Sequence, residues 1–200
     1  MVSTPIHLGI AGTHGTNTTT LARRIEMELR GTGLTVARIG GLAKQAAERG
    51  FPKMTRHTTA STEWIITFGA AAALHAELTA DVVIVDGTAH NAVAYYLAAV
   101  QHHDRQPTPD DLDHLTTLAR IHTRRQILIM ATVLDPAAPF EAHHGKDPDY
   151  PDAAFRATVD QRLHRLLTDQ RPDYIAVSPL DHAPAIQAAL TTVVERLDTP

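Results

Sequence analysis

The sequence contains no cysteine, only three lysines and few aromatic residues, and these absences narrow the range of functions. Without cysteine, disulfide bonds, thiolate metal sites and cysteine nucleophiles are excluded. A formal net charge of −4 does not favour a general nucleic-acid surface. No apolar run reaches bilayer-crossing length, and the first residues lack the basic-then-apolar pattern of a signal peptide. We therefore expect one cytoplasmic domain over residues 1–200, without a membrane partner.

Apolar runs and segments of helical periodicity alternate along the chain. The apolar runs predict strands at residues 6–11, 34–39, 82–86, 126–133 and 174–177. The periodic segments predict helices from about residue 18, at 42–49, from 61 to about 79, and at 92–101, 112–124, 153–167 and 183–197. This alternation predicts an α/β fold with a parallel sheet, right-handed crossovers and helices on both faces.

Parallel sheets of this kind bind ligands at the carboxyl ends of their strands. That rule predicts a crevice formed by residues 12–19, 40–44, 86–91, 134–150 and 178–182. Within it, residues 135–152 carry four prolines and several charges. This composition predicts a mobile, lid-like loop.

The turn after the first predicted strand reads Gly12-Thr13-His14-Gly15-Thr16-Asn17-Thr18-Thr19-Thr20. The phosphate-binding pattern is glycine, four residues, glycine, lysine, then serine or threonine. Gly12 and Thr19 fit its first and last positions, and Gly15 adds backbone freedom. With an apolar strand before it and an amphipathic helix after it, residues 12–20 are predicted to bind nucleotide phosphates, with Thr19 as a Mg²⁺ ligand.

Two positions depart from this pattern. Asn17 stands where glycine is expected, and asparagine tolerates positive φ, so we expect the turn to survive. Thr18 stands where lysine is expected. Thr18 carries no charge and is too short to reach between the β- and γ-phosphates. Losing such a clamp from a dry site costs roughly a hundredfold or more in rate.

Other cations are candidates to replace the lysine or to bind the acceptor. Lys44 follows the second predicted strand on the crevice side, and Lys53 and Arg56 form a small basic patch suited to an anionic acceptor. Arg120 and Arg124 cluster at a helix end, where a kinase lid would supply charge, and are candidate catalytic residues. A solvated surface role is the alternative for each of them.

Asp86 ends a buried strand at the crevice and is predicted to act in catalysis and metal binding, with a helix N-cap as the alternative. His14 would add positive charge if protonated, or would pack the loop. The adjacent histidines at 102–103 and 143–144 lack the spacing of a zinc site, so Mg²⁺ is the expected metal. Ser178 lacks the elbow motif of a serine hydrolase.

The residues Gly-Ile-Ala-Gly-Thr-His-Gly-Thr at 9–16, followed by Thr-Thr-Leu-Ala-Arg-Arg at 19–24, resemble the P-loop kinase-like ATPases related to the nicotinamide riboside kinase domain. The wider nucleoside and nucleotide kinases share that fold. Weaker likeness at residues 42–51, 82–86, 94–96 and 154–167 extends the resemblance over most of the chain.

The resemblance implies a three-layer P-loop NTPase fold with a five-stranded parallel sheet in the order 2-3-1-4-5. It implies ATP and Mg²⁺ as cofactors, and transfer to a small hydroxyl or phosphate acceptor. It also implies that Gly12, Gly15 and Thr19 hold phosphates and metal, and that Asp86 lies near the metal.

The departures from the family lie at charged positions: Gly87 where arginine is usual and Asn91 where an acidic residue is common, besides Asn17 and Thr18. Three functions therefore stay open. The chain is a nucleoside- or nucleotide-type kinase with a relocated cation, an inactive pseudo-kinase that binds a nucleotide or a partner, or a repurposed nucleotide-processing hydrolase. A homodimer is also open.

Overall fold

The computed structural model describes residues 4–135, 137 and 153–198. Its centre is a sheet of five parallel strands in the order β2-β3-β1-β4-β5. The strands are β1 (Ile6–Ala11), β2 (Val36–Ile39), β3 (Val82–Asp86), β4 (Gln126–Thr132) and β5 (Ile175–Val177). The five parallel strands and their order are confirmed.

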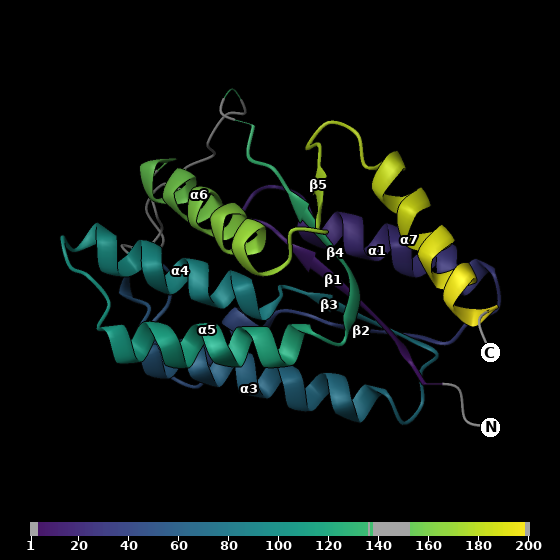
Figure 1. Cartoon of the computed structure of the whole chain (residues 1–200), viewed down its shortest axis with the longest axis horizontal. Coiled ribbons are helices and arrows are strands. Elements are labelled where there is room, and N and C mark those ends of the chain that lie inside the picture. The colour runs from purple at the N-terminus through teal and green to yellow at the C-terminus, as the bar shows by residue number, and fades with distance from the viewer. Residues whose placement is uncertain (1–3, 136, 138–152, 199–200) are drawn as a thin grey trace.

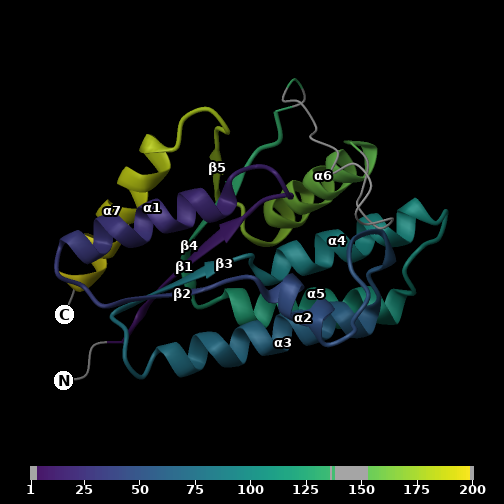
Figure 2. The same cartoon turned by 180° about the vertical axis from the view of Figure 1, so that it is seen from behind.

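Helices cover both faces of this sheet. They are α1 (Thr18–Gly31), α2 (Leu42–Glu48), α3 (Thr59–Ala76), α4 (Ala89–His102), α5 (Pro109–Thr123), α6 (Ala153–Gln170) and α7 (Ala183–Leu197), with a 3-10 helix, η1, at Met54–Arg56. Helices α1 and α7 lie on one face, and α3, α4, α5 and α6 lie on the other (Figures 1 and 2). The three layers are therefore as predicted.

Strand β1 shows why the sequence forms this arrangement. All six of its residues are buried, so both of its faces need apolar partners. Leu8 and Ile10 pack against α1 and α7, while Ala11 packs toward α4 and α6. Burying a leucine or isoleucine side chain stabilises the fold by roughly 1.5–3 kcal/mol, so this central strand holds the two helical layers to the sheet.

Three helices begin earlier than the sequence predicts, and one of them, α4, begins at Ala89 rather than at residue 92. Helix α3 begins at Thr59 because Thr58 caps it. Ser61, where the helix was predicted to begin, completes a capping box with Thr58. Helix α5 begins at Pro109, behind a Thr108 cap. Proline is well suited to that first turn, where its missing N–H leaves no helical bond unmade.

Part of the predicted lid-like loop, namely residues 136 and 138–152, lies outside the described residues, and Lys146 and the histidines at 143–144 lie there too. None of the described helices combines the length and apolar character that crossing a bilayer requires.

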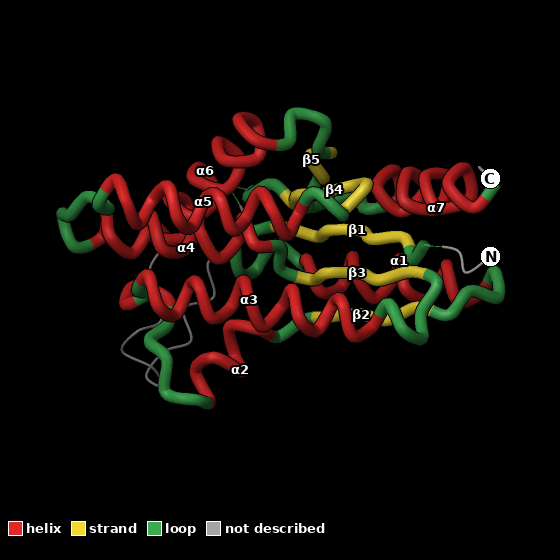
Figure 3. Tube along the Cα trace, turned by 60° about the horizontal axis from the view of Figure 1, so that its bottom comes forward, coloured by secondary structure: helices red, strands yellow, loops and turns green. Residues whose placement is uncertain are grey.

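The carboxyl ends of β1, β3 and β2 reach one edge of the sheet. Figure 3 shows these strands lying side by side, with α3 running along one face of the sheet that they form. The segments that follow them are residues 12–17, 87–88 and 40–41. They belong to three of the five segments from which the crevice was expected to form, and they build the site described next. Of the other two, residues 178–182 line neither pocket in the described part of the chain, and most of 134–150 lies outside the described residues.

Candidate functional site

The loop between β1 and α1 is built on a glycine that admits no side chain. Gly12 has φ of 155°, and a Cβ there would lie 2.0 Å from Thr132 Oγ1 and 2.6 Å from Thr18 Cγ2. The Asn91 side-chain amide donates to the Gly12 carbonyl at 2.6 Å. The backbone at Gly12 is therefore pressed against β4 on one side and held by α4 on the other.

Buried hydroxyl groups connect the loop to itself and to β4. The Thr16 hydroxyl donates to the Thr13 carbonyl at 2.6 Å and lies 2.6 Å from the Thr132 hydroxyl. Both side chains are buried. The side chain of Thr16 is thus committed to the protein interior, and only its backbone amide can meet a ligand.

Asn17 adopts the left-handed conformation, with φ of 63° and ψ of 24°, as expected for the residue that replaces glycine. It precedes α1 without a side-chain cap, and the first turn of α1 carries no acidic residue. Within the part of the chain that the structure describes, the amides of Gly15, Thr16, Asn17 and Thr18 donate to no protein acceptor. Four N–H groups without a protein acceptor, at the positive end of a helix, are available to bind an anion.

A pocket of about 450 Å³ adjoins these amides. Its walls come from the loop, α2, η1, α3 and the start of α4, and its lining includes Gly12, Thr13, His14, Thr18, Thr19, Leu42, Lys44, Lys53, His57, Ile65, Asp86, Asn91 and Tyr95. The structure therefore brings most of the predicted loop residues together with Asp86, Lys44 and Lys53.

Tyr95 organises one wall of the pocket. Its hydroxyl lies 2.9 Å from the backbone nitrogen of His14, which donates to it, and 2.9 Å from His14 Nδ1. The rings of Tyr95 and His57 are 5.8 Å apart. The neighbouring Tyr96, in contrast, is buried in the core.

The two pocket histidines are uncharged near neutral pH. Burial, together with the charge of Arg156, lowers the pKa of His14 to about 4. Burial alone lowers the pKa of His57 to about 4. His14 therefore does not supply the positive charge that the missing lysine would bring.

Asp86 is the acidic residue of the pocket. It ends β3 and is 9% exposed. Arg38 Nη1 lies 3.5 Å from its Oδ2, whereas Arg38 Nε makes a shorter, 2.9 Å bond to Glu26. Oδ1 of Asp86 accepts no hydrogen bond from a described group. A carboxylate with a weak cationic neighbour and a free oxygen is suited to bind a metal ion or a hydroxyl.

Arg156 is a cation that the sequence analysis did not single out. Although it comes from α6, its guanidinium carbon lies 3.6 Å from where a side chain on Gly15 would begin. It is 6% exposed. Its spacing to the buried Val159 and Leu163 puts it on the inner face of α6, which is the one signal that could have revealed it.

Two predicted catalytic residues lie elsewhere. Arg120 and Arg124 are exposed at the end of α5, which leads into the first residue of β4 and hence to the amino edge of the sheet. Because β4 has seven residues at about 3.3 Å each, Arg124 lies on the order of 20 Å from the phosphate loop. The prediction that they supply charge there is not met.

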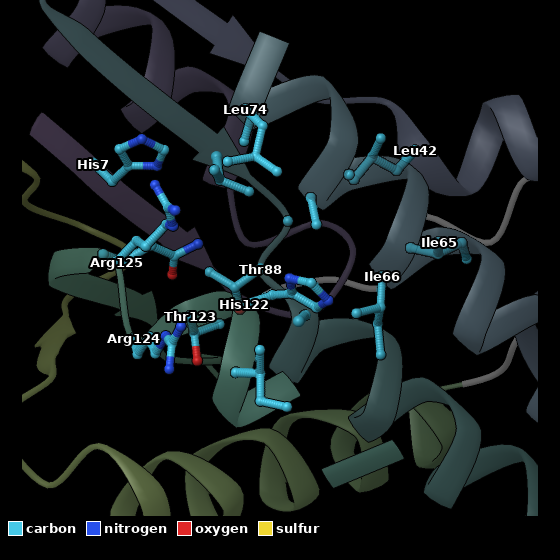
Figure 4. A pocket seen from close by; sticks show the side chains of 18 of the residues that line it. His7, Leu42, Ile65, Ile66, Leu74, Thr88, His122, Thr123, Arg124 and Arg125 are labelled. Carbon is cyan, nitrogen blue, oxygen red and sulfur yellow. The ribbon is translucent and has the colours of Figure 1, made fainter. Parts of the chain in front are cut away.

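Arg124 instead lines a second, smaller pocket of about 190 Å³ between the sheet, α3 and the end of α5. Figure 4 shows Arg124, Arg125 and His7 at one end of this pocket and Leu42 and Ile65 at the other. Leu42 and Ile65 also line the larger pocket, so the two cavities share a wall.

Of the three predicted substrate residues, two line the larger pocket and one does not. Lys44 lines the larger pocket but its side chain is 82% exposed and lies 3.8 Å from Glu48. Lys53 also lines it. Arg56 is exposed at the end of η1 and is not among the residues that line the pocket in the described part of the chain.

Comparison with known proteins finds similar structures but no match by sequence. No protein-family model matches the chain, and curated proteins give no match. Two solved structures of the NadR protein, one in complex with NR and one with NAD and AMP-PNP, match 94% of this chain with TM-scores of 0.63 and 0.65. Sequence identity is 15% and 16%, and this chain spans 50% and 49% of theirs. The chain has a P-loop nucleotide-kinase-like fold. At this identity the similarity establishes the fold alone.

In a P-loop fold, the residues available for Mg²⁺ here are a hydroxyl and a carboxylate. Thr19 is exposed in the first turn of α1, and Asp86 lies in the same pocket. Oxygen ligands from one or two side chains, with phosphates and water, are the usual environment of Mg²⁺. The residues present therefore fit this ion. Among the described residues, no group of three histidine, aspartate or glutamate side chains is arranged to hold a metal.

Proposed function

We propose that this chain binds a nucleoside triphosphate at the P-loop and transfers a phosphoryl group to a small nucleoside-type acceptor in the 450 Å³ pocket. The observation that carries the proposal is the set of four unbonded amides from Gly15 to Thr18, beside a pocket that contains Asp86. Phosphoryl transfer depends mainly on positioning and on neutralising charge, and this arrangement serves both.

The phosphates would lie over the loop. Amides of residues 15–18 would donate to phosphate oxygens, and the positive end of α1 would favour their charge. Thr19 and Asp86 would hold Mg²⁺, which when bound neutralises phosphate charge. The closed packing around Gly12 and Thr16 fixes the loop before ligand arrives, so little order has to be gained on binding.

The acceptor would occupy the neighbouring pocket. A volume of about 450 Å³ is in the range of small-molecule sites. Tyr95 and His57 offer ring faces to a base, and Asn91 offers a polar group at the floor. The free oxygen of Asp86 would accept a hydrogen bond from an acceptor hydroxyl and orient it toward the phosphate.

The NadR structures support this choice of ligand class, because their complexes contain NR, NAD and AMP-PNP. They do not select the acceptor for this chain. Nicotinamide riboside is therefore one member of the acceptor panel to be tested, together with the common nucleosides and nucleoside monophosphates.

A second candidate function is nucleotide binding without transfer, as a pseudo-kinase or partner-binding module. Two observations favour it: Thr18 occupies the lysine position, and Arg38 lies beside Asp86, where it competes with a metal ion for the carboxylate. Both features weaken catalysis while leaving the four unbonded amides intact.

Calorimetry and a transfer assay together separate these functions. The purified chain would be titrated with Mg²⁺–AMP-PNP and then incubated with labelled ATP and the acceptor panel, with Asp86→Asn as the matched variant. Nucleotide binding together with phosphoryl transfer, where the transfer is lost in Asp86→Asn, supports the kinase function. Binding without transfer to any acceptor supports the binding module. Folded protein that binds no nucleotide contradicts both.

A further inference from the structure

The P-loop of this chain lacks the cation that normally faces the nucleotide phosphates. Thr18 stands at the lysine position, and the loop itself, residues 12–17, contains no lysine or arginine. A triphosphate carries several negative charges, so a nest of neutral amides leaves most of that charge uncompensated.

We propose that Arg156 of α6 replaces the missing lysine and contacts the nucleotide phosphates bound over Gly15. This inference rests on the proposed function. It assigns the positive charge of the phosphate site to a residue more than a hundred positions away from the loop in sequence, on a different helix.

The position of Arg156 carries the argument. Gly15 has φ of 75° and no side chain, so the guanidinium can approach the loop backbone directly. Nη1 and Cζ of Arg156 lie 3.6 Å, and Nε 4.0 Å, from where a Cβ on Gly15 would be. A phosphate that accepts from the amides of residues 15–18 would therefore lie within reach of this guanidinium.

The backbone holds Arg156 in place. The Thr13 hydroxyl donates to the Arg156 carbonyl at 3.4 Å. Phe155, the preceding residue, is buried with Val159 and Leu163 in the cluster that packs α6 against α4 and the sheet. The first turn of α6 is thus attached to the loop, which sets the point from which the Arg156 side chain extends toward Gly15.

The electrostatics of the site agree with this placement. An arginine stays protonated at any physiological pH, so its charge persists even in a side chain that is 6% exposed. Burial, and after it the charge of Arg156, lowers the pKa of His14. A guanidinium also matches phosphate geometry with two parallel donors, which an ammonium does not.

The competing cations, Lys44 and Lys53, lie in the pocket that adjoins the loop. Of the two, Lys44 projects into solvent. Arg156 is not among the residues lining that pocket within the described part of the chain. Of these cations, Arg156 is the one whose guanidinium lies against Gly15.

The test compares Arg156→Met and Arg156→Lys, each with and without Thr18→Lys, by calorimetry with Mg²⁺–AMP-PNP and with AMP. Arg156→Met should weaken AMP-PNP binding about 10- to 100-fold and AMP binding less, because fewer charges are involved. Arg156→Lys should retain part of the affinity. Adding Thr18→Lys to Arg156→Met should restore most of it, since the charge returns at the usual position.

Arg162→Met is the matched control, because Arg162 lies on the same helix and bonds to Gln101 at 2.7 Å. It should bind as the unmutated chain does. Circular dichroism and thermal melting would show that each variant is folded, and Arg156→Lys keeps the test open if Arg156→Met does not fold.

Full AMP-PNP affinity in a folded Arg156→Met chain would overturn the inference. A loss that Thr18→Lys does not restore would also overturn it, because it would show that Arg156 only supports the shape of the loop. If the unmutated chain binds no AMP-PNP at all, the proposed function fails first, and this inference with it.

Discussion

At the scale of single residues, the loop is specified by contacts rather than by the usual motif. Gly12 lies against Thr132, Thr18 and Thr16, and a Cβ there would meet all three within 2.8 Å. Asn17 supplies the left-handed turn that glycine usually provides. The conformation of the loop therefore rests on these packing contacts, and none of them requires a lysine at position 18.

This packing predicts that Gly12→Ala lowers the free energy of unfolding by about 1–3 kcal/mol, since backbone or neighbouring side chains must move. Gly31→Ala is the matched control. Gly31 has no neighbour within 4 Å of its Cβ position and lies at the end of α1, so alanine there should be neutral or stabilise by up to about 1 kcal/mol. Urea denaturation of both variants checks this. Equal effects in the two variants would contradict the packing argument.

At the scale of elements, α1 shares with α2, α4 and α7 a first turn that has neither a side-chain cap nor an acidic residue. Helix α3 has a capping box, and α5 has a Thr108 cap with Asp110 and Asp111 in its first turn. Helix α1 has neither a side-chain cap nor an acidic residue there. The first-turn amides of α1 are therefore open to an external anion, but it is the motif-like turn at residues 12–19, and not the missing cap, that distinguishes α1 from α2, α4 and α7.

A carboxylate placed in the first turn of α1 should stabilise the free protein and weaken its binding of AMP-PNP. Thr20→Glu puts a negative charge at the third helical position, which should stabilise the free protein by about 0.3–1 kcal/mol. The same charge should repel phosphate and weaken AMP-PNP binding several-fold. Thr20→Gln is the uncharged control. Thermal melting and calorimetry measure the two effects, and tighter AMP-PNP binding in Thr20→Glu would contradict the anion site.

At the scale of the whole molecule, three buried histidines make stability depend on pH. Burial is the main cause that lowers the pKa values of His14, His57 and His90 to about 4 each. In the unfolded chain these groups titrate near pH 6.5. Their stabilising effect is therefore complete above pH 6.5 and is lost as the pH falls from 6.5 toward 4.

The expected loss is about 1.4 kcal/mol per pH unit for each such histidine, before allowance for partial exposure. Urea denaturation at pH 7, 6 and 5 should show the midpoint falling steadily. His90→Gln removes one titrating group, so the slope of the unfolding free energy against pH should decrease by about 1.4 kcal/mol per pH unit, even if the variant is less stable at every pH. A midpoint that stays constant or rises between pH 7 and pH 5 would show that these histidines are not held neutral.

Much of the fold could be predicted because β1 and β3 are short, apolar runs buried on both faces, and the turn after β1 carries most of a known pattern. The sheet order came from the family resemblance. Helix starts were less certain, since Thr58 and Ser61 are both capable caps and only the structure shows their roles.

The site was predicted where it follows from strand ends and missed where it depends on tertiary packing. Asp86 and the loop residues lie together because parallel strands end at one edge. Arg124 was misplaced, although a helix that leads into a parallel strand must end at the amino edge. Arg156 was not predicted because its approach to Gly15 depends on how α6 packs, which no local pattern encodes.

The central claim is that the backbone amides of residues 15–18 form an anion-binding nest without a lysine. Titration of ¹⁵N-labelled protein with Mg²⁺–AMP-PNP, followed by amide NMR, tests it most directly. We predict saturable shifts that are largest at Gly15, Thr16, Asn17 and Thr18 and move to lower field, as expected for N–H groups that gain a charged acceptor. Unchanged resonances at these four amides, at nucleotide concentrations that shift signals elsewhere, would contradict the account.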